Sequence, residues 1–365
     1  MNKRVVVAMS GGVDSSVAAA LLKEQGYEVI GITMRIWEEP LRKKSMVAVA
    51  QEKKYSCCGG EPAISDARRV AHKLNIPYYT LDFQKEFKEN VVQDFIHEYE
   101  KGRTPNPCIR CNRFVKFDIL LNRCREFNAD YLATGHYARI EKIDNRWLLK
   151  KGIDTKKDQS YFLYTMTQKQ LSKTLMPLGN LTKTEVRKIA KDLDLVVAEK
   201  PESQEICFIP DDDYAGFLKE FIPEAAKPGP ILNKSGKVIG EHKGILNYTI
   251  GQRKRIGIPS KERLYVTGID LKKNAIVVGN EKEGYGNELV ADDVNYIALK
   301  KLENPMRIKA KIRSVHPAAE AEIKPIDQRI YLRFVEPQWA ITPGQAVVFY
   351  DGDVVLGGGT IVLNR

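Results

Sequence analysis

Short apolar runs alternate with helical patterns through the first half of the chain. Four runs predict buried strands, and they lie at residues 5–9, 28–34, 76–82 and 131–136. Between them lie four predicted helices: a continuous apolar run at residues 17–22, and apolar residues at the three- and four-residue spacing of a helix at residues 67–74, 87–99 and 117–124. This alternation predicts an α/β fold with a doubly wound parallel sheet, which binds ligands at the carboxyl ends of its strands.

The pattern changes after Lys227-Pro228-Gly229-Pro230, a sequence typical of a domain boundary. Beyond it, apolar and charged residues alternate over short stretches, as at residues 308–313, with frequent turns between them. A period of two without helix-length patterns predicts a small β-barrel at the C-terminus. The length of the chain predicts about two or three domains, and we place three, at residues 1–210, 211–290 and 291–365.

Two segments outside the main pattern have local predictions. Residues 103–112 contain two prolines before Cys108, which predicts a loop, and Asn112 would then cap the next helix. Residues 140–151 predict a hairpin that turns at Asp144-Asn145.

The stretch Ser10-Gly11-Gly12-Val13-Asp14-Ser15-Ser16 joins the first strand to the first helix. Its two glycines allow a sharp bend and a close approach to a ligand, and the helix N-terminus favours phosphate. Asp14 suits such a site if a magnesium ion bridges it to the phosphate. The Lys-Ser/Thr ending of a Walker A loop is absent. The stretch resembles the pyrophosphatase loop (PP-loop), SGGxDS, of enzymes that cleave ATP between the α and β phosphates; a turn that only joins strand to helix is the alternative.

The charge of the chain favours a polyanionic partner. A formal net charge of +11 suits nucleic acid, although a generally basic protein has the same excess. The basic runs at residues 251–255 and 307–313 either track an RNA backbone or form a solvated face. No run approaches the ~18 apolar residues of a membrane span, and the N-terminus enters a strand at once. We expect a cytoplasmic protein.

Six cysteines without a secretion signal predict reduced thiols. Cys108 and Cys111 form a C-x-x-C at a helix start, which is typical either of a reactive thiol or of half a zinc site completed by Cys57 and Cys58. Cys207 stands alone, either as a buried apolar residue or as a reactive one. Other residues of interest are Cys124, which its helical spacing places in the core, and His136, at the ligand edge of the sheet.

Five motifs occur in order along the chain, at residues 10–16, 104–107 with 111–112, 134–139, 157–163 and 203–210. Together they resemble the tRNA-specific 2-thiouridylases, which place sulfur at C2 of the wobble uridine of tRNA. The resemblance covers nearly the whole chain. It implies a PP-loop ATP-binding catalytic domain at residues 1–210, followed by a central tRNA-binding or linker domain and the β-barrel.

The resemblance also implies the functional residues. The ATP-binding residues, used with Mg²⁺, would be Ala8, Met9, Ser10, Gly11, Gly12, Val13, Asp14, Ser15, Met34 and Gly135. The target base would contact Asn106, Pro107 and Cys108, and the tRNA would contact Lys157, Asp158, Gln159, Arg313 and Ser314. Cys111 matches the nucleophile and Cys207 the persulfide carrier. The implied partners are tRNAs for glutamine, glutamate and lysine and a sulfur-donor protein, such as a cysteine desulfurase or a relay protein.

The residue types suit that chemistry. The C2 oxygen of uracil is a poor leaving group, and its attack on the α-phosphate of ATP makes an adenylate from which AMP can depart. Sulfur would arrive as a persulfide on Cys207, and Cys111 would release it by forming a disulfide with Cys207.

One departure from the family pattern leaves a second route open. Many family members have Asp where this chain has Cys108, so Cys108, Cys111 and Cys207 could instead ligate an iron–sulfur cluster whose open iron binds sulfide. Two further alternatives are a PP-loop ligase that uses another nucleophile and a non-catalytic RNA-binding protein. The pair Cys57-Cys58 has no assigned role.

Overall fold

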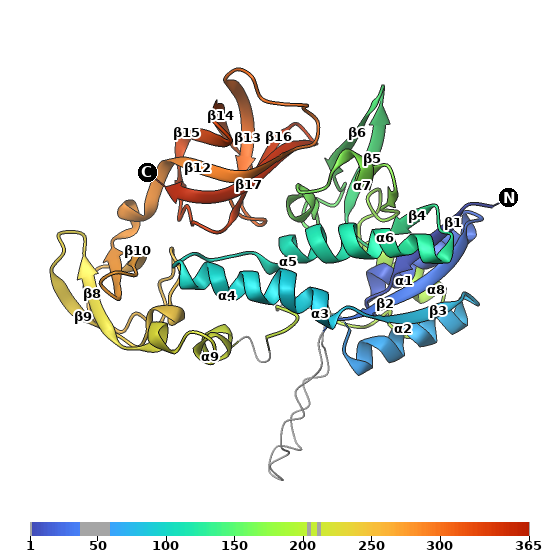
Figure 1. Cartoon of the computed structure of the whole chain (residues 1–365), viewed down its shortest axis with the longest axis horizontal. Coiled ribbons are helices and arrows are strands. Elements are labelled where there is room, and N and C mark those ends of the chain that lie inside the picture. Colours follow the sequence, from blue (N-terminus) through green and yellow to red (C-terminus); the bar gives the residue numbers. More distant parts are fainter. Residues whose placement is uncertain (1, 37–58, 203–205, 210–212, 365) are drawn as a thin grey trace, which may run out of the picture. The chain divides into compact units, whose positions relative to one another are not determined.

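The computed structural model of the chain describes residues 2–36, 59–202, 206–209 and 213–364. Two units make up the fold (Figure 1). The first comprises Met1–Val91, Cys108–Phe208 and Asp353–Val355, and the second comprises Val92–Pro107, Ile209–Gly352 and Leu356–Arg365.

The first unit is built on a five-stranded sheet in which every adjacent pair is parallel. Its strands, in sheet order, are β3 (Tyr78–Asp82), β2 (Glu28–Arg35), β1 (Arg4–Ala8), β4 (Tyr131–Ala133) and β7 (Thr174–Leu175). The chain builds outward from β1 to β3 on one side and from β4 to β7 on the other. The predicted doubly wound parallel sheet is confirmed, and its switch point lies between β1 and β4.

Helices α1 (Val13–Glu24) and α2 (Glu61–Lys73) pack on strands of this sheet, and α8 (Lys183–Asp192) packs on α1. The other helices of the first unit are α3 (Gln84–Phe87), η1 (Lys88–Val92), α5 (Pro107–Arg110), η2 (Cys111–Leu120), α6 (Leu121–Arg123), η3 (Cys124–Phe127), η4 (Ser160–Leu163) and α7 (Gln168–Leu171), whereas α4 (Gln93–Glu100) belongs to the second unit. Val17 and Ala18 of α1 share one buried cluster with Val70 of α2 and Val186 of α8. The predicted hairpin is confirmed as β5 (Ala138–Ile143) and β6 (Arg146–Lys151).

The prediction for residues 103–112 is partly wrong. The helix begins at Pro107 and continues through α5 into η2, so Asn112 lies inside it rather than at its cap. Proline is tolerated in a first helical turn because its missing N–H would have no partner there. The buried Asn112 amide donates instead to the Phe162 carbonyl, at 3.0 Å.

The second unit contains two separate β structures. Strands β8 (Gly229–Asn233), β9 (Val238–His242), β10 (Tyr265–Asp270) and β11 (Ala275–Gly279) form one sheet, with α9 (Tyr214–Lys219), η6 (Pro223–Ala226), η7 (Ile245–Asn247) and η8 (Glu281–Gly284) nearby in sequence. Strands β12 (Tyr285–Tyr296), β13 (Met306–Lys311), β14 (Ala319–Ile326), β15 (Arg329–Trp339), β16 (Ala346–Asp351) and β17 (Val354–Asn364) form the other.

The second structure closes on itself because β12 pairs with both β15 and β17. The predicted C-terminal β-barrel is therefore confirmed. Its core, which includes Leu289, Ile323 and Phe349, is distinct from the core of the four-stranded sheet around Ile231 and Ile276. The first barrel strand begins at Tyr285, whereas the three domain boundaries stay predictions. No helix in the described ranges is long and apolar enough to cross a membrane.

Candidate functional site

The loop between β1 and α1 has a backbone that only glycine permits at one point. Gly11 has a φ of +69°, and a Cβ atom there would lie 2.2 Å from the Ala63 carbonyl oxygen. Ser15 Oγ accepts a hydrogen bond from the Ser10 N–H at 3.1 Å, and Ser16 Oγ donates to the Gly12 carbonyl at 2.8 Å. The Ser16 hydroxyl therefore stabilises the loop through a hydrogen bond to the loop's own backbone.

The adjacent strand β4 brings a second turn against this loop. A Cβ at Gly135 would lie 2.7 Å from the Ser15 nitrogen, so the turn packs backbone to backbone on the start of α1. Both turns follow the carboxyl ends of the strands that flank the switch point, where open α/β sheets bind ligands.

Two cavities lie at this edge and share Ser10, Asp14 and Gln159. The lysine cavity, of about 270 Å³, is lined by Ser10, Gly11, Gly12, Val13, Asp14, Tyr137, Lys157, Gln159, Lys183, Lys200, Pro201 and Glu202. The methionine cavity, of about 180 Å³, is lined by Ala8, Met9, Ser10, Asp14, Ser15, Ile32, Thr33, Met34, Gly59, Lys116, Thr134, Gly135, His136 and Gln159. All ten residues predicted to bind ATP line one cavity or the other.

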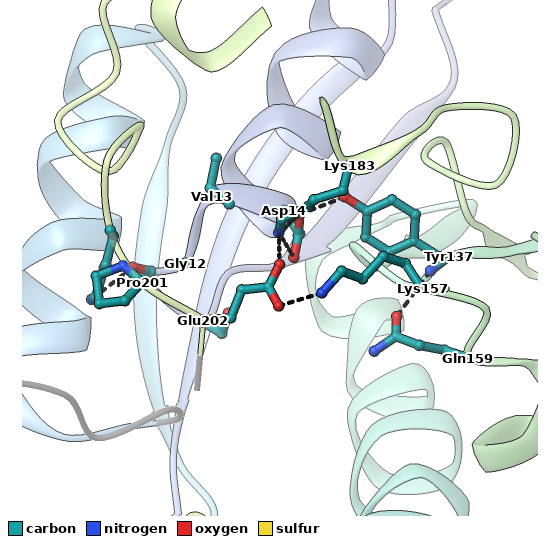
Figure 2. Close-up of a pocket in the computed structure, with 12 residues that line it drawn as sticks. Gly12, Val13, Asp14, Tyr137, Lys157, Gln159, Lys183, Pro201 and Glu202 are labelled. Atoms are coloured by element: carbon teal, nitrogen blue, oxygen red, sulfur yellow. Dashed lines mark hydrogen bonds and ion pairs between the residues drawn. The ribbon is translucent and has the colours of Figure 1, made fainter. Parts of the chain in front are cut away.

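Asp14 is the centre of a charged network in the lysine cavity (Figure 2). Lys183 Nζ donates to both of its carboxylate oxygens, at 2.7 and 2.8 Å, and the Tyr137 hydroxyl donates to one of them at 2.8 Å. Burial and then the Asp14 charge raise the pKa of Tyr137, so the phenol keeps its proton and donates. The network holds the loop carboxylate in one position.

Two further ion pairs extend the network. Glu202 pairs with Lys157 at 2.6 Å and with Lys183 at 3.0 Å. Partial burial alone would raise the pKa of Glu202, but hydrogen bonds from the two lysines hold it below its usual value. Lys200 donates to the Gly11 carbonyl at 2.9 Å and to Asp66 at 2.7 Å, which fixes the loop from its other side.

Sequence reasoning missed Tyr137, Lys183, Lys200 and Glu202 as residues of the site. Lys183 carried one signal: it stands first in α8, where a cation opposes the helix dipole. Tyr137 lies inside the motif at residues 134–139 and Glu202 directly precedes the motif at residues 203–210, but no spacing in the sequence relates either residue to Asp14.

The methionine cavity is more apolar and has one fixed polar wall. Thr33 Oγ1 donates to the Met9 carbonyl at 2.7 Å and accepts from the Tyr78 hydroxyl at 2.8 Å. His136 Nδ1 lies 2.8 Å from Thr134 Oγ1. Burial and then the charge of Lys116 lower the pKa of His136 well below its ordinary value, so this histidine is a neutral wall of the cavity.

The described cysteines differ in exposure. Cys108 is exposed on α5, Cys111 is buried at the start of η2, and Cys207 is half-buried beside Phe208, whose ring packs 5.6 Å from that of Phe87. Cys124 is buried, as predicted; its thiol donates to the Leu120 carbonyl, and burial raises its pKa to about 12.

The structure does not support the iron–sulfur hypothesis. Across the described ranges, no group of three His, Cys, Asp or Glu side chains is placed to hold a metal ion, although Cys108, Cys111 and Cys207 all lie within those ranges. Cys57 and Cys58, the other half of the predicted zinc site, lie outside the described residues, as do residues 203–205 and 210 of the fifth motif.

The remaining predicted contacts fall into three groups. Asn106 is half-buried and Pro107 is buried directly before Cys108. Lys157 and Gln159 line the lysine cavity, whereas Asp158 accepts hydrogen bonds from the Gly152 and Ser160 N–H groups and so holds its own turn. In the second unit, Arg313 donates to the Ile250 and Ala340 carbonyls and to Thr342 Oγ1, next to the half-buried Ser314.

The two basic runs have different surroundings. On β13, Arg307 and Lys309 lie opposite Glu322 and Glu320 of β14, so that run faces carboxylates of its own sheet. In the other run, Arg253, Lys254 and Arg255 are exposed. The latter run fits a polyanionic partner better.

Three family models match in succession along the chain. They are described as the tRNA methyl transferase HUP domain at residues 3–211, the tRNA methyl transferase PRC-barrel domain at residues 215–280 and the aminomethyltransferase beta-barrel domain at residues 286–361.

Curated relatives match over almost the entire chain. A tRNA-specific 2-thiouridylase MnmA of Caldanaerobacter subterraneus is 54% identical over 99% of this chain and 98% of its own. Proteins of the same name from Symbiobacterium thermophilum and Clostridium acetobutylicum are 53% and 50% identical, over 98% and 99% of this chain and 92% and 100% of theirs. A solved 4-thiouridine synthetase–RNA complex with bound ATP is similar at 17% identity and a TM-score of 0.36, over 61% of this chain and 51% of that one, which is too distant to support an argument.

Proposed function

Because the chain belongs to the family of tRNA-specific 2-thiouridylases, we propose that it catalyses the ATP-dependent 2-thiolation of the wobble uridine of tRNA. One observation carries the proposal within this structure. The ten residues that the family resemblance implies for ATP binding line two adjoining cavities at the switch point of the sheet.

The two cavities suit the two ends of ATP. The methionine cavity has apolar walls from Met9, Ile32 and Met34 that fit a flat adenine ring. The lysine cavity offers the loop, the N-terminus of α1 and three lysines to the phosphates. The shared residues Ser10 and Asp14 would then lie near the α-phosphate, where the bond to pyrophosphate breaks.

The residues present fit a magnesium ion. Asp14 supplies a carboxylate that reaches both cavities, and the Ser10 and Ser15 hydroxyls lie 3.3 Å from one another beside it. Bound there, Mg²⁺ would neutralise phosphate charge and favour attack at the α-phosphate.

The reaction proceeds in two halves. The C2 oxygen of uridine attacks the α-phosphate, the bond to the β-phosphate breaks, and pyrophosphate leaves. The Cys111 thiolate then attacks the Sγ of a Cys207 persulfide, which forms a Cys111–Cys207 disulfide and releases hydrosulfide. Hydrosulfide adds to C2, AMP leaves with the former C2 oxygen, and two external thiols reduce the disulfide.

The proposed partners come from the family resemblance. A tRNA is the acceptor, with glutamine, glutamate and lysine tRNAs expected, and a cysteine desulfurase or relay protein would load the persulfide on Cys207. Residues 215–280 contain 12 Lys or Arg and 5 Asp or Glu, a formal charge of +7 out of +11 for the chain. This excess supports RNA binding by the central region.

The test separates adenylation from sulfur transfer. We expect Cys207→Ser to release pyrophosphate in the presence of tRNA and ATP but to form no 2-thiouridine, measured by mass spectrometry of digested tRNA. Cys124→Ser, a buried thiol of η3, is the matched control and should retain thiolation. Thiolation by Cys207→Ser would contradict the persulfide route, ammonia-driven AMP release would favour a ligase, and tRNA binding without pyrophosphate release would favour a non-catalytic protein.

A further inference from the structure

Lys183 has contacts that its helix does not need. It is the first residue of α8, is 9% exposed, and bonds to Asp14 and Glu202 inside the lysine cavity. A cation at a helix N-terminus opposes the helix dipole, and burying a charge costs free energy. The helix start is already satisfied by the capping box of Thr182 and Glu185. The charge of Lys183 therefore serves the cavity rather than the helix.

We propose that Lys183 is an exchange residue for the pyrophosphate part of ATP. In the ligand-free protein it pairs with Asp14, and when the nucleotide binds it moves to the β- and γ-phosphates and stabilises the pyrophosphate as it leaves. This inference rests on the proposed ATP-dependent function, to which it adds a catalytic residue that the sequence did not indicate.

The charges of the cavity call for such an exchange. Each of its three lysines is paired with a carboxylate: Lys157 with Glu202, Lys183 with Asp14 and Glu202, and Lys200 with Asp66. The triphosphate brings several negative charges into this balanced site. One Mg²⁺ offsets only part of this charge, and a lysine that transfers from a carboxylate to the phosphates offsets more of it.

The carboxylates that Lys183 leaves keep other partners. Asp14 retains the Tyr137 hydroxyl at 2.8 Å, and Glu202 retains Lys157 at 2.6 Å. Breaking a buried ion pair is costly chiefly when it strands the remaining charge. Glu202 keeps a cation and Asp14 keeps a hydrogen bond, so the exchange costs less than stranding either group would, and it frees the charge of Asp14 for a bound cation.

Lys200 is less suited to this movement. Its ammonium bonds the Gly11 carbonyl as well as Asp66, so its departure would release the loop that shapes the cavity. The Lys183 ammonium bonds to the side chain of Asp14 and, among the residues that the structure describes, makes no hydrogen bond to the loop backbone. Of the two, Lys183 is the lysine that can move without disturbing the loop.

Nucleotide binding without tRNA tests the proposal, since it does not depend on sulfur transfer. Calorimetry on the full chain would compare three probes: α,β-methylene-ATP with Mg²⁺, inorganic pyrophosphate with Mg²⁺, and AMP. We expect Lys183→Met to weaken the first two by roughly 10- to 100-fold, the value of a charge-assisted hydrogen bond, and to leave AMP within about twofold. Lys183→Arg should restore part of the loss.

The matched control is Lys191→Met, on the same helix, where the side chain pairs with Glu199 at the surface; all three probes should bind it normally. Equal weakening of AMP and α,β-methylene-ATP by Lys183→Met would overturn the proposal, as would unchanged binding of both. If Lys183→Met does not fold, Lys183→Gln carries the same comparison. A selective loss in a protein that never thiolates tRNA would sustain the role of Lys183 and remove the proposed sulfur transfer. Failure of the wild type to bind either phosphate probe would remove both.

Discussion

The cations of the lysine cavity and those of the central region differ in what surrounds them. In the cavity, Lys183 and Lys200 are buried or nearly so, and each is bonded to a carboxylate. In the central region, Arg253, Lys254 and Arg255 are exposed at the surface. Buried cations act at fixed positions on one ligand, whereas exposed cations act additively on a polyanion and are screened by salt.

The C-terminal barrel sharpens this comparison. Residues 286–361 contain 9 Lys or Arg and 10 Asp or Glu, a formal charge of −1, against +7 for residues 215–280. The exposed cations of β13 also lie opposite glutamates of β14. A count of basic residues in a run therefore does not identify an RNA-binding surface; the charge of the neighbouring strand must be included.

The largest effect is expected from Asp14→Asn. The substitution removes the carboxylate that both cavities share and leaves Lys183 with Glu202 alone, so we expect tRNA-dependent pyrophosphate release to fall about 100-fold or more. Binding of tRNA should not change. A coupled pyrophosphate assay and a filter-binding assay measure the two quantities, and a parallel loss in both would break the distinction between cavity and surface.

Lys200→Met is expected to impair the use of ATP less than Asp14→Asn does and to destabilise the folded protein. The change removes hydrogen bonds to the Gly11 carbonyl and Asp66, which should lower the free energy of unfolding by about 1–3 kcal/mol and raise the KM for ATP. Urea unfolding and steady-state kinetics measure these changes. Unaltered stability would show that the loop does not depend on this contact.

A moderate, salt-dependent effect is expected from Arg253→Gln, Lys254→Gln and Arg255→Gln combined. If these side chains contact phosphates, the slope of log K for tRNA against log salt should fall by about one per lost contact, with the rate at saturating tRNA unchanged. Binding measured at several salt concentrations gives the slope. An unchanged slope would remove this run from the RNA surface.

The smallest effect is expected from Arg307→Gln combined with Lys309→Gln on β13. Because Glu322 and Glu320 lie opposite them, tRNA affinity should stay within about twofold of the wild type at any salt concentration. This variant is the matched control for the central-region substitutions. A drop as large as theirs would show that the barrel face binds tRNA despite its glutamates.

Local patterns determined much of this protein. The PP-loop lies in one stretch of seven residues. Apolar runs and helical spacing predicted the parallel sheet, and the alternation of apolar and charged residues predicted the barrel. The loop, the strands and the helices depend on residues that are close together in the chain, so the sequence predicts them directly. Proline was the exception: two prolines indicated a loop before Cys108, yet one of them starts a helix in which Asn112 is internal.

Only the tertiary structure decided which charges meet. Lys183 lies 169 positions from Asp14 and Lys200 lies 189 positions from Gly11, and no local spacing relates them. The sheet order places the turns after β1 and β4 side by side, and α8 packs on α1, which brings Lys183 to the loop. Ion pairs between residues so far apart in the sequence depend on the order of the strands in the sheet. The packing of distant segments excludes water and brings a carboxylate next to an ammonium group.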